Sequence, residues 1–368
     1  MSACVECLRR ARLVGFLAVR IADALADRRG ASAILALSDQ DLIRAVAGDT
    51  RAEALRLVKG FDARAAREEL EAAGLHGVCR HDQLYPSPLL DLGDPPALIH
   101  STAAPERLAE LCAGPGVAVV GTRRASAYGI EVAQDLARGL TEAGVTVISG
   151  MALGIDAAAH RGALDAGGPT VAVLGCGADR AYPRTHSALY QRIRAEGAVI
   201  AELPPGQRPE KWTFPARNRI MAGLARVTVV VEAAERSGSL ITASFAQDLG
   251  RDVGAVPGRV TARMAAGANE LLHAGAALVR GPEDVLDMLF GAGNWSSRQN
   301  GARAARRAAL DPGLRRILRA VEAGDGLDDF ARGAGLPAAD VRAALGRLEL
   351  LGLVRRDGLG SYERVAGR

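Results

Sequence analysis

The chain has 368 residues, of which 49% are hydrophobic and 24% are charged, so it can build two or three domains around a large apolar core. No run of about 18 apolar residues occurs, which predicts that no helix crosses a membrane. The N-terminal residues lack the charged and apolar layout of a secretory signal. We therefore expect a cytoplasmic protein that makes no membrane contact.

Arginine supplies almost all of the positive charge, because Lys59 and Lys211 are the only lysines, and the formal net charge is +4. Genome base composition explains such a bias without any function. A surface rich in arginine also suits phosphate, because a guanidinium can bind it through two hydrogen bonds. The modest net charge does not exclude nucleic acid, for which a local basic patch is sufficient.

Residues 1–75 have apolar residues at helical spacing and no strand pattern, which predicts a small helical domain of the SAM or helix-hairpin-helix kind. A connector at 76–104 follows. Its prolines favour extended and turn conformations.

From about residue 105, apolar strand-like runs alternate with helical segments. This alternation predicts a mostly parallel sheet with helices on both faces, an α/β Rossmann-like core that with its connector spans 76–290. The expected strands are 116–121, 145–150, 170–177, 198–203, 226–233, 252–258 and 276–281.

Residues 291–310 begin as a polar linker with glycine and serine, and 311–368 form a further domain. Three helical segments are followed by two short strands around Asp357–Gly358, which is typical of a winged helix. In winged helices that read DNA, the third helix enters a groove of the duplex. Others dock proteins, and the sequence leaves both roles open. The cations of the third helix and the wing are Arg342, Arg347, Arg355 and Arg356.

Five cysteines are present, and an odd number in a cytosolic chain argues against a disulfide framework. Cys4 and Cys7 form a CxxC pair. A zinc site would need two more ligands, and no second CxxC exists. We therefore expect incidental thiols, with no metal and no cofactor.

Ligands of open parallel sheets bind at the carboxyl ends of the strands, and here those ends are rich in glycine and polar residues. The first core strand ends in GTRRAS, where Arg123 precedes Ser126, a candidate helix cap. The second ends in SGMALGID, which places Asp156 and His160 one helical turn apart. That pair suits either acid–base chemistry or a structural tie of the helix.

A third anion-friendly turn follows the fifth core strand, where Arg236 precedes Ser237, Gly238 and Ser239. Three such turns on one sheet edge indicate a phosphate-binding site. No GxGxxG follows the first strand, and neither a Walker-type GxxxxGK[ST] nor a GxSxG nucleophile elbow occurs. Nothing in these motifs requires catalysis.

The segment KWTFPARNR places Lys211, Trp212, Phe214, Arg217 and Arg219 just ahead of a buried strand. Single-stranded nucleic acid is held by a positive groove and by aromatic faces on which bases stack. The segment supplies both components. The structural alternative is that the aromatic side chains plug the sheet and that the two arginines pair with acids.

These motifs together resemble the DNA-processing protein A family (DprA/Smf). The resemblance spans residues 117 to 280, and the helical start and the winged-helix-like end agree with family members that carry both. The matching segments are GTRRAS, SGMALGIDAAAHRGAL, AVLGCGADRAYP, FPARNRIMAGL, EAAERSGSLITASFAQDLGRDVGAVPG and GANELLHAGA.

The resemblance implies a non-catalytic protein that binds single-stranded DNA, protects incoming strands in natural transformation or recombination, and loads the recombinase RecA. It also implies a homodimer formed through the core, and the segment 269–276 is our candidate surface. The expected DNA-binding residues are Arg123, Lys211, Phe214, Arg236 and the turn Ser237, Gly238 and Ser239. Arg217, Asn218 and Arg219 belong to the family motif and are expected either to contact DNA or to tie the structure together.

One departure from the family pattern is His186, because the family often has asparagine at this position after the Tyr-Pro pair.

The main alternative is an enzyme, a nucleotide-processing Rossmann protein of the phosphoribohydrolase type. Such enzymes usually carry PGGxGT with a downstream glutamate, whereas this chain has SGSLIT and no PGGxGT. A nucleotide sensor or scaffold is the third possibility.

Overall fold

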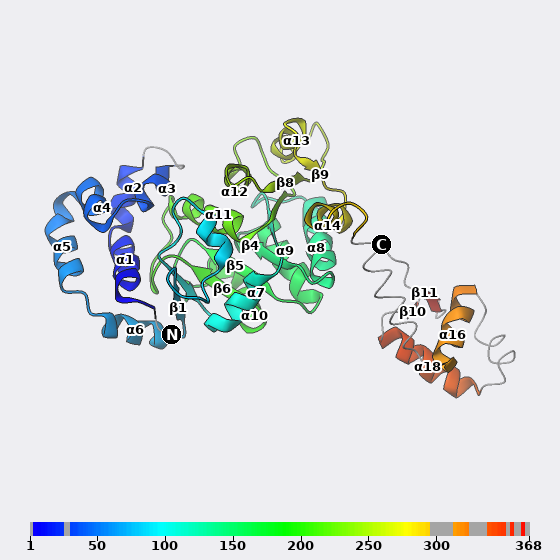
Figure 1. The fold of residues 1–368 in the computed structure, drawn as a ribbon. Coiled ribbons are helices and arrows are strands. Elements are labelled where there is room, and N and C mark those ends of the chain that lie inside the picture. The colour runs from blue at the N-terminus through cyan, green and yellow to red at the C-terminus, as the bar shows by residue number, and fades with distance from the viewer. Residues whose placement is uncertain are drawn as a thin grey trace. The chain divides into compact units, whose positions relative to one another are not determined.

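The computed structural model describes residues 3–25, 30–294, 312–323, 337–350, 354–356 and 362–364. The chain divides into two compact units, Met1–Leu289 and Phe290–Arg368 (Figure 1). Among the described residues, no helix combines the length and apolar character needed to span a membrane.

A nine-stranded mixed sheet forms the centre of the first unit, with strand order β1-β2-β6-β5-β4-β3-β7-β8-β9. From β6 to β9 in this order, each strand is parallel to the next, which confirms the predicted Rossmann-like core. The strands are β1 (His76–Cys79), β2 (Leu98–Ser101), β3 (Gly116–Val120), β4 (Thr146–Ser149), β5 (Thr170–Leu174), β6 (Ala198–Ala201), β7 (Val227–Val230), β8 (Asp252–Ala255) and β9 (Ala277–Leu278).

All seven expected core strands are present, but the sequence did not reveal β1 and β2. These two strands lie in the proline-rich connector, pair antiparallel with each other, and extend the sheet at β6. Between them the chain forms a short 3-10 helix, η3 (Ser87–Asp91). The prolines occupy this intervening stretch, where they remove no ladder hydrogen bond.

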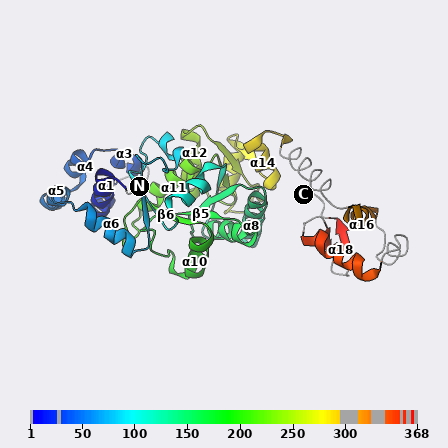
Figure 2. The same ribbon diagram turned by 60° about the horizontal axis from the view of Figure 1, so that its bottom comes forward.

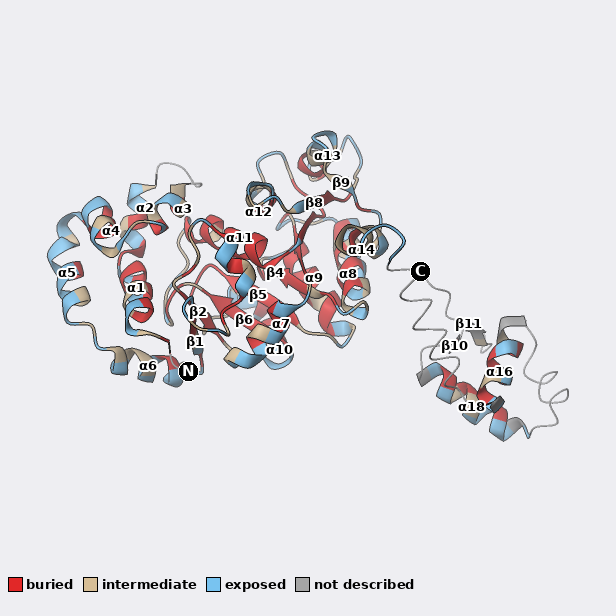
Figure 3. Ribbon diagram, viewed as in Figure 1, coloured by how far each residue is buried: buried red, intermediate tan, exposed pale blue. Residues whose placement is uncertain are grey.

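Helices cover both faces of the sheet. Alternate residues of each buried strand point to opposite faces, as Val171 and Val173 do on one side and Ala172 and Leu174 on the other. Figure 2 shows α11 and α12 on one side of the strands and α8 and α10 on the other, and Figure 3 shows the strands almost wholly buried. The core helices are α7 (Pro105–Ala113), α8 (Ala127–Glu142), α9 (Ile155–Asp165), η4 (Arg184–His186), α10 (Ser187–Glu196), α11 (Thr213–Leu224), α12 (Gly238–Asp248), α13 (Ala266–His273) and α14 (Pro282–Phe290).

The strand order reverses at β3, which lies between β4 on one side and β7 on the other. The chain leaves β3 in one direction through β4, β5 and β6, then returns through α11 to β7. At such a switch point the loops that follow adjacent strands diverge and leave a crevice at the carboxyl edge. This topology predicts where a ligand would bind.

The N-terminal helices pack in the same compact unit as the sheet. Trp212, at the start of α11, is buried among their apolar side chains and donates its indole N–H to the carbonyl of Ala18 over 2.8 Å. These helices therefore help to fix the start of α11. They are α1 (Val5–Phe16), α2 (Ala18–Ala24), α3 (Ala31–Leu35), α4 (Asp39–Val46), η2 (Gly48–Thr50), α5 (Arg51–Lys59) and α6 (Ala63–Ala72).

The second unit contains α16 (Pro312–Ala323), α18 (Ala338–Leu350), β10 (Val354–Arg356) and β11 (Tyr362–Arg364). The two strands pair antiparallel, as the winged-helix pattern predicts, and the apolar sides of the helices pack around Leu345 and Leu348. Arg342 and Arg347 of α18 are exposed. The expected middle helix and most of the linker lie outside the described residues.

Candidate nucleic-acid interface

A cavity of about 430 Å³ opens at the carboxyl edge of the sheet, at the switch point beside β3. It is called the groove below. Its walls come from the turn after β3, the turn after β4, the first half of α11 and the turn after β7. The residues that line it include Arg123, Lys211, Phe214, Arg217, Asn218 and the turn Ser237–Ser239. The structure thus brings together eight of the ten expected site residues, and the exceptions are Arg219 and Arg236.

The turn after β3 is built around a buried acid. The predicted cap is confirmed, because the Ser126 hydroxyl accepts the Gly129 N–H at the start of α8 over 3.0 Å. The Glu232 carboxylate then accepts both the Ser126 N–H, at 2.9 Å, and the Ser126 hydroxyl, at 2.6 Å. Glu232 follows β7, so it ties the two turns on either side of the switch point together. No motif in the sequence marked this acid.

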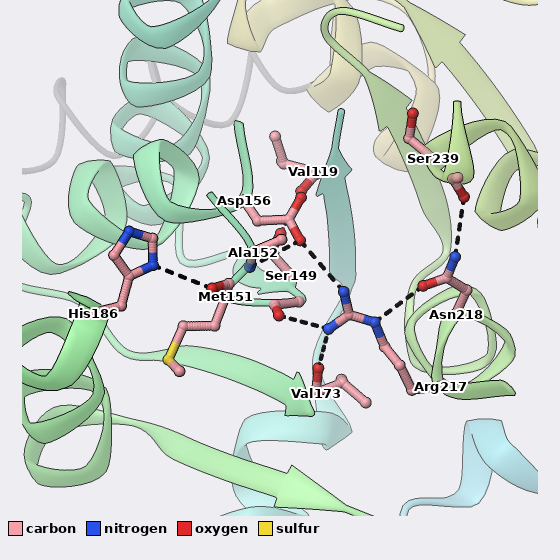
Figure 4. Close-up of polar contacts among 12 residues, drawn as sticks. Val119, Ser149, Met151, Ala152, Asp156, Val173, His186, Arg217, Asn218 and Ser239 are labelled. Atoms are coloured by element: carbon pink, nitrogen blue, oxygen red, sulfur yellow. Dashed lines mark hydrogen bonds and ion pairs between the residues drawn. The ribbon is translucent and has the colours of Figure 1, made fainter. Parts of the chain in front are cut away.

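The floor of the groove is organised by Arg217, which is buried in the interior of α11 (Figure 4). Its guanidinium donates to the carbonyl of Gly150 at 2.6 Å and to that of Val173, at the ends of β4 and β5. It also forms an ion pair with Asp156 at 3.6 Å. Arg217 therefore fastens α11 to two strand ends and has little capacity left for a ligand.

Gly150 is required by this arrangement, because a Cβ atom there would overlap the guanidinium of Arg217. Burial raises the pKa of the Asp156 carboxyl, and the charge of Arg217 partly offsets that rise. The pair is thus enclosed in a poorly hydrated position. Through these contacts the pair holds α11 against the ends of β4 and β5.

Asn218 links the floor to the turn after β7. Its side-chain oxygen accepts from Arg217 Nε at 3.0 Å, and its amide nitrogen donates to the carbonyl of Gly238 at 3.1 Å (Figure 4). Ser237 caps α12 by accepting from the Ser239 N–H. The hydrogen bond from Asn218 to Gly238 places the N-terminus of α12 at the groove. The free N–H groups of this helix end favour the binding of an anion there.

The rim of the groove is a stack of cationic and aromatic groups. The guanidinium of Arg123 lies 4.9 Å from the ring centroid of Phe214, and the ring of Tyr182 lies 5.7 Å from Phe214 on a tilt of 37°. A second, smaller cavity of about 90 Å³ adjoins the same side chains. Tyr182 is 39% exposed, so part of its ring faces solvent beside this stack.

Tyr182 was not among the expected site residues. The signal available in the sequence was its position in the loop that follows β5, at the carboxyl edge of the sheet where the other expected site residues lie. Leu153, in the turn after β4, is a second exposed apolar residue at this rim.

Three cations of the expected set remain available to a ligand. Arg123, Lys211 and Arg236 are all exposed, and none has a carboxylate within ion-pairing distance among the described residues. Arg236 does not line the cavity, but it directly precedes the Ser237 cap. Their charge can therefore be neutralised by phosphate.

Arg219 lies elsewhere. Its side chain is 1% exposed and pairs with Asp94 and Glu202, both at 2.8 Å. Burial alone would lower the pKa of this guanidinium, but the two carboxylates more than offset that effect and raise it. Arg219 anchors α11 to the connector and to the end of β6. This placement removes it from the residues that we propose to contact a ligand.

Asp156 and His160 do not act as a pair, because Asp156 faces Arg217 and the His160 ring Nδ1 lies 2.8 Å from the Thr170 hydroxyl.

His186, the departure from the family pattern, has its Nδ1 3.2 Å from the carbonyl of Met151 (Figure 4). Met151 has a positive φ of 55°, which non-glycine residues seldom adopt. His186 thus supports the turn after β4 from behind the groove.

The fold and the groove define a class: a Rossmann-like α/β protein with an open, cationic and aromatic-rimmed anion site at the switch point of its sheet. Within the described residues, no group of His, Cys, Asp or Glu beside the groove has the geometry of a metal site. Comparison with known proteins makes the assignment specific. The family model described as DNA recombination-mediator protein A matches residues 76–290, and the chain belongs to this family.

A second model, the DprA winged helix domain, matches residues 301–358. A DprA protein of Mycobacterium tuberculosis is 47% identical over 258 residues, which cover 69% of this chain and 66% of that protein. The Smf protein of Synechocystis is 34% identical over 312 residues, which cover 78% of that protein. The predicted family and the winged-helix domain are thereby confirmed.

Two solved structures share the fold. DprA of Streptococcus pneumoniae superposes with a TM-score of 0.62 at 33% identity, covering 78% of this chain and 98% of that one. DprA of Helicobacter pylori, whose structure concerns its single-stranded DNA binding mode, gives a TM-score of 0.52 at 29% identity and covers 58% of this chain and 95% of that one.

Proposed function

We propose that this protein binds single-stranded DNA in the groove and acts as a recombination mediator. The observation that carries the proposal is the combination at one site of exposed cations, an aromatic stack and the N-terminus of α12. Phosphates would bind Arg123, Lys211 and Arg236, and bases would stack on the Phe214–Tyr182 surface. The membership of the family and the strand-binding homologue from Helicobacter pylori support this assignment.

Strand selectivity follows from the shape of such a site. Stacking on an aromatic face contributes about 1–3 kcal/mol per base, and only an unpaired base can present its face. A duplex keeps its bases stacked inside, so it would contact the cations alone. The protein should therefore prefer single strands and show little preference for sequence.

The finer parts of the proposed function are strand protection and the loading of RecA during transformation or recombination. A homodimer formed near α13 and β9 would present two grooves to one strand. Simultaneous contact raises the effective concentration of the second groove, so long strands should bind much more tightly than short ones. A covered strand is also shielded from nucleases until the recombinase replaces the mediator.

The direct test is fluorescence anisotropy of labelled oligo-dT, titrated with the full chain, with an unlabelled duplex of equal length as competitor. We expect binding of the single strand and weak competition by the duplex. Equal competition by the duplex would contradict the proposal. Binding of mononucleotides with hydrolysis, but not of oligo-dT, would instead indicate the nucleotide-processing enzyme.

RecA loading needs its own measurement. The rate at which RecA forms filaments on single strands coated with single-strand-binding protein should rise when the chain is added. An unchanged filament rate beside normal strand binding would remove the loading step and leave strand binding intact.

A further inference from the structure

Three thiols and one imidazole meet at the junction between the N-terminal helices and the sheet. Cys4 and Cys7 lie at the start of α1, Cys79 ends β1, and His81 follows two residues later. One ligand atom from each of the four lies within 4.8 Å of all the others. The sulfurs of Cys4 and Cys7 are each 3.5 Å from Nδ1 of His81.

These separations are close to those of a tetrahedral metal site. With Zn–S bonds of about 2.3 Å and a Zn–N bond of about 2.0 Å, a regular tetrahedron places sulfur about 3.5 Å from nitrogen, and sulfurs about 3.8 Å apart. The two S–N distances already match. The longest separation in the cluster needs to shorten by only about 1 Å for a cation to touch all four atoms.

The backbone holds the Cys79–His81 half of the cluster in position. Cys79 pairs with Leu98 in the β1–β2 ladder, and the Arg80 N–H donates to the carbonyl of Ala97 at 3.1 Å. The Asp82 N–H then donates to the Cys79 carbonyl at 2.8 Å, which closes a tight turn that brings the His81 ring back beside Cys79. A site formed this way exists before any metal arrives.

The local charge suits thiolates. Cys4 is the N-cap of α1, and Cys7 lies in its first turn, where the unpaired N–H groups favour negative charge. Arg80, placed between Cys79 and His81 in the chain, adds a positive charge beside the cluster. Three thiolates around a divalent cation would leave one net negative charge, which these groups offset.

The sequence predicted incidental thiols, because it contains no second CxxC. The other half of the cluster is instead a Cys-x-His pair more than 70 residues away, and the packing of α1 against β1 and β2 places it there. Cys79 and His81 are therefore the two missing ligands that the sequence could not reveal.

We propose that Cys4, Cys7, Cys79 and His81 bind a structural Zn²⁺ ion. Four protein ligands of the Cys₃His type close the coordination shell and leave no position for a substrate, as in structural rather than catalytic zinc sites. The ion would link the start of α1 to β1 and so fix the N-terminal helices on the sheet. The site shares no residue with the groove.

The test measures metal in the full chain purified under reducing conditions, by mass spectrometry of the elements. We expect about one zinc per chain in the wild type. Replacement of zinc by Co²⁺ should give the absorption of a tetrahedral thiolate complex. Removal by a strong chelator should lower Tm, because binding to the folded state alone stabilises it.

Variants decide whether these four residues are the ligands. His81→Ala removes an exposed ligand at little risk to folding, and Cys79→Ala removes a buried one. Both should lose affinity for zinc by more than the roughly 10–100-fold that removal of a second-shell partner costs. Cys112→Ala, at a buried cysteine of α7 outside the cluster, is the matched control and should keep the metal.

Three results would overturn the proposal. The first is a reduced wild type that neither contains nor takes up zinc. The second is full zinc retention in both His81→Ala and Cys79→Ala. The third is iron in place of zinc, or a disulfide among the three cysteines that persists in the reducing buffer.

Discussion

At the scale of single residues, two arginines of one motif have different tasks. Arg217 and Arg219 are separated by two positions in α11, and residues at that spacing lie on different faces of a helix. One therefore faces the strand ends and the other faces Asp94 and Glu202. The sequence predicts that both matter but cannot divide contact from anchoring, because that division depends on acids far away in the chain.

A buried histidine makes stability depend on pH. Burial lowers the pKa of His160 from 6.5 to about 3, and its Nδ1–H bonds to the Thr170 hydroxyl, which itself donates to the carbonyl of Val147. Above pH 6.5 both folded and unfolded chains keep this ring neutral. Below it the unfolded chain gains a proton that the folded chain refuses, so stability falls as pH falls toward about 3.

We expect His160 to contribute a loss of about 1.4 kcal/mol in the free energy of unfolding for each pH unit below its unfolded value. Urea unfolding at pH 7 and pH 5 measures this loss in the free energy of unfolding. His160→Gln should reduce the pH dependence but not abolish it, because burial also lowers the pKa of His100, to about 4. His273→Gln, at an exposed position, should leave the pH dependence unchanged. An equal slope in wild type and His160→Gln would refute the assignment to this ring.

At the scale of elements, α11 shows what pattern alone misses. The sequence placed its residues next to a buried strand but gave no amphipathic stripe, because the helix is buried almost all round. The core strands were predictable, since continuous apolar runs mark strands buried on both faces. The strands β1 and β2 were not, because their pairing depends on contacts with β6 far along the chain.

One added methyl group tests whether the turn after β4 packs tightly against α11. Gly150→Ala would force the Arg217 guanidinium out of its position and leave Asp156 buried without its partner. Breaking a buried pair in this way costs about 3–5 kcal/mol. We expect a large fall in Tm and loss of strand binding together.

The control is Gly114→Ala, because a Cβ atom at Gly114 meets no other atom within 4 Å and its φ is −83°. Thermal unfolding followed by circular dichroism compares the two variants. A Gly150→Ala variant as stable as Gly114→Ala would show that Arg217 does not fasten α11 to the strand ends.

At the scale of the whole molecule, the proposed dimer concerns the edge of the sheet formed by β9. Leu278 in this strand is 50% exposed, and α13 beside it carries the partly exposed Leu271 and Leu272. An exposed strand edge with apolar side chains is typical of a surface that pairs with another chain. We therefore place the dimer contact there.

Leu278→Glu should convert a dimer into a monomer, as measured by light scattering after size-exclusion chromatography. Its affinity for a short oligonucleotide should stay unchanged, while the gain shown by long strands should disappear. Leu55→Glu, at a 49% exposed leucine of α5, is the matched control. A Leu278→Glu protein that remains dimeric would locate the contact elsewhere.

We propose above that exposed cations of the groove bind the phosphates of a single strand. The most direct measurement is the salt dependence of oligo-dT affinity for wild type, Arg123→Ala and Arg138→Ala, an exposed arginine of α8 outside the groove. Arg123→Ala should weaken binding and reduce the slope of log affinity against log salt by about 0.7, the value for one phosphate contact, with Tm unchanged. Arg138→Ala should match wild type. An Arg123→Ala protein with wild-type affinity and slope would show that Arg123 does not bind the strand and that the groove is not the DNA site.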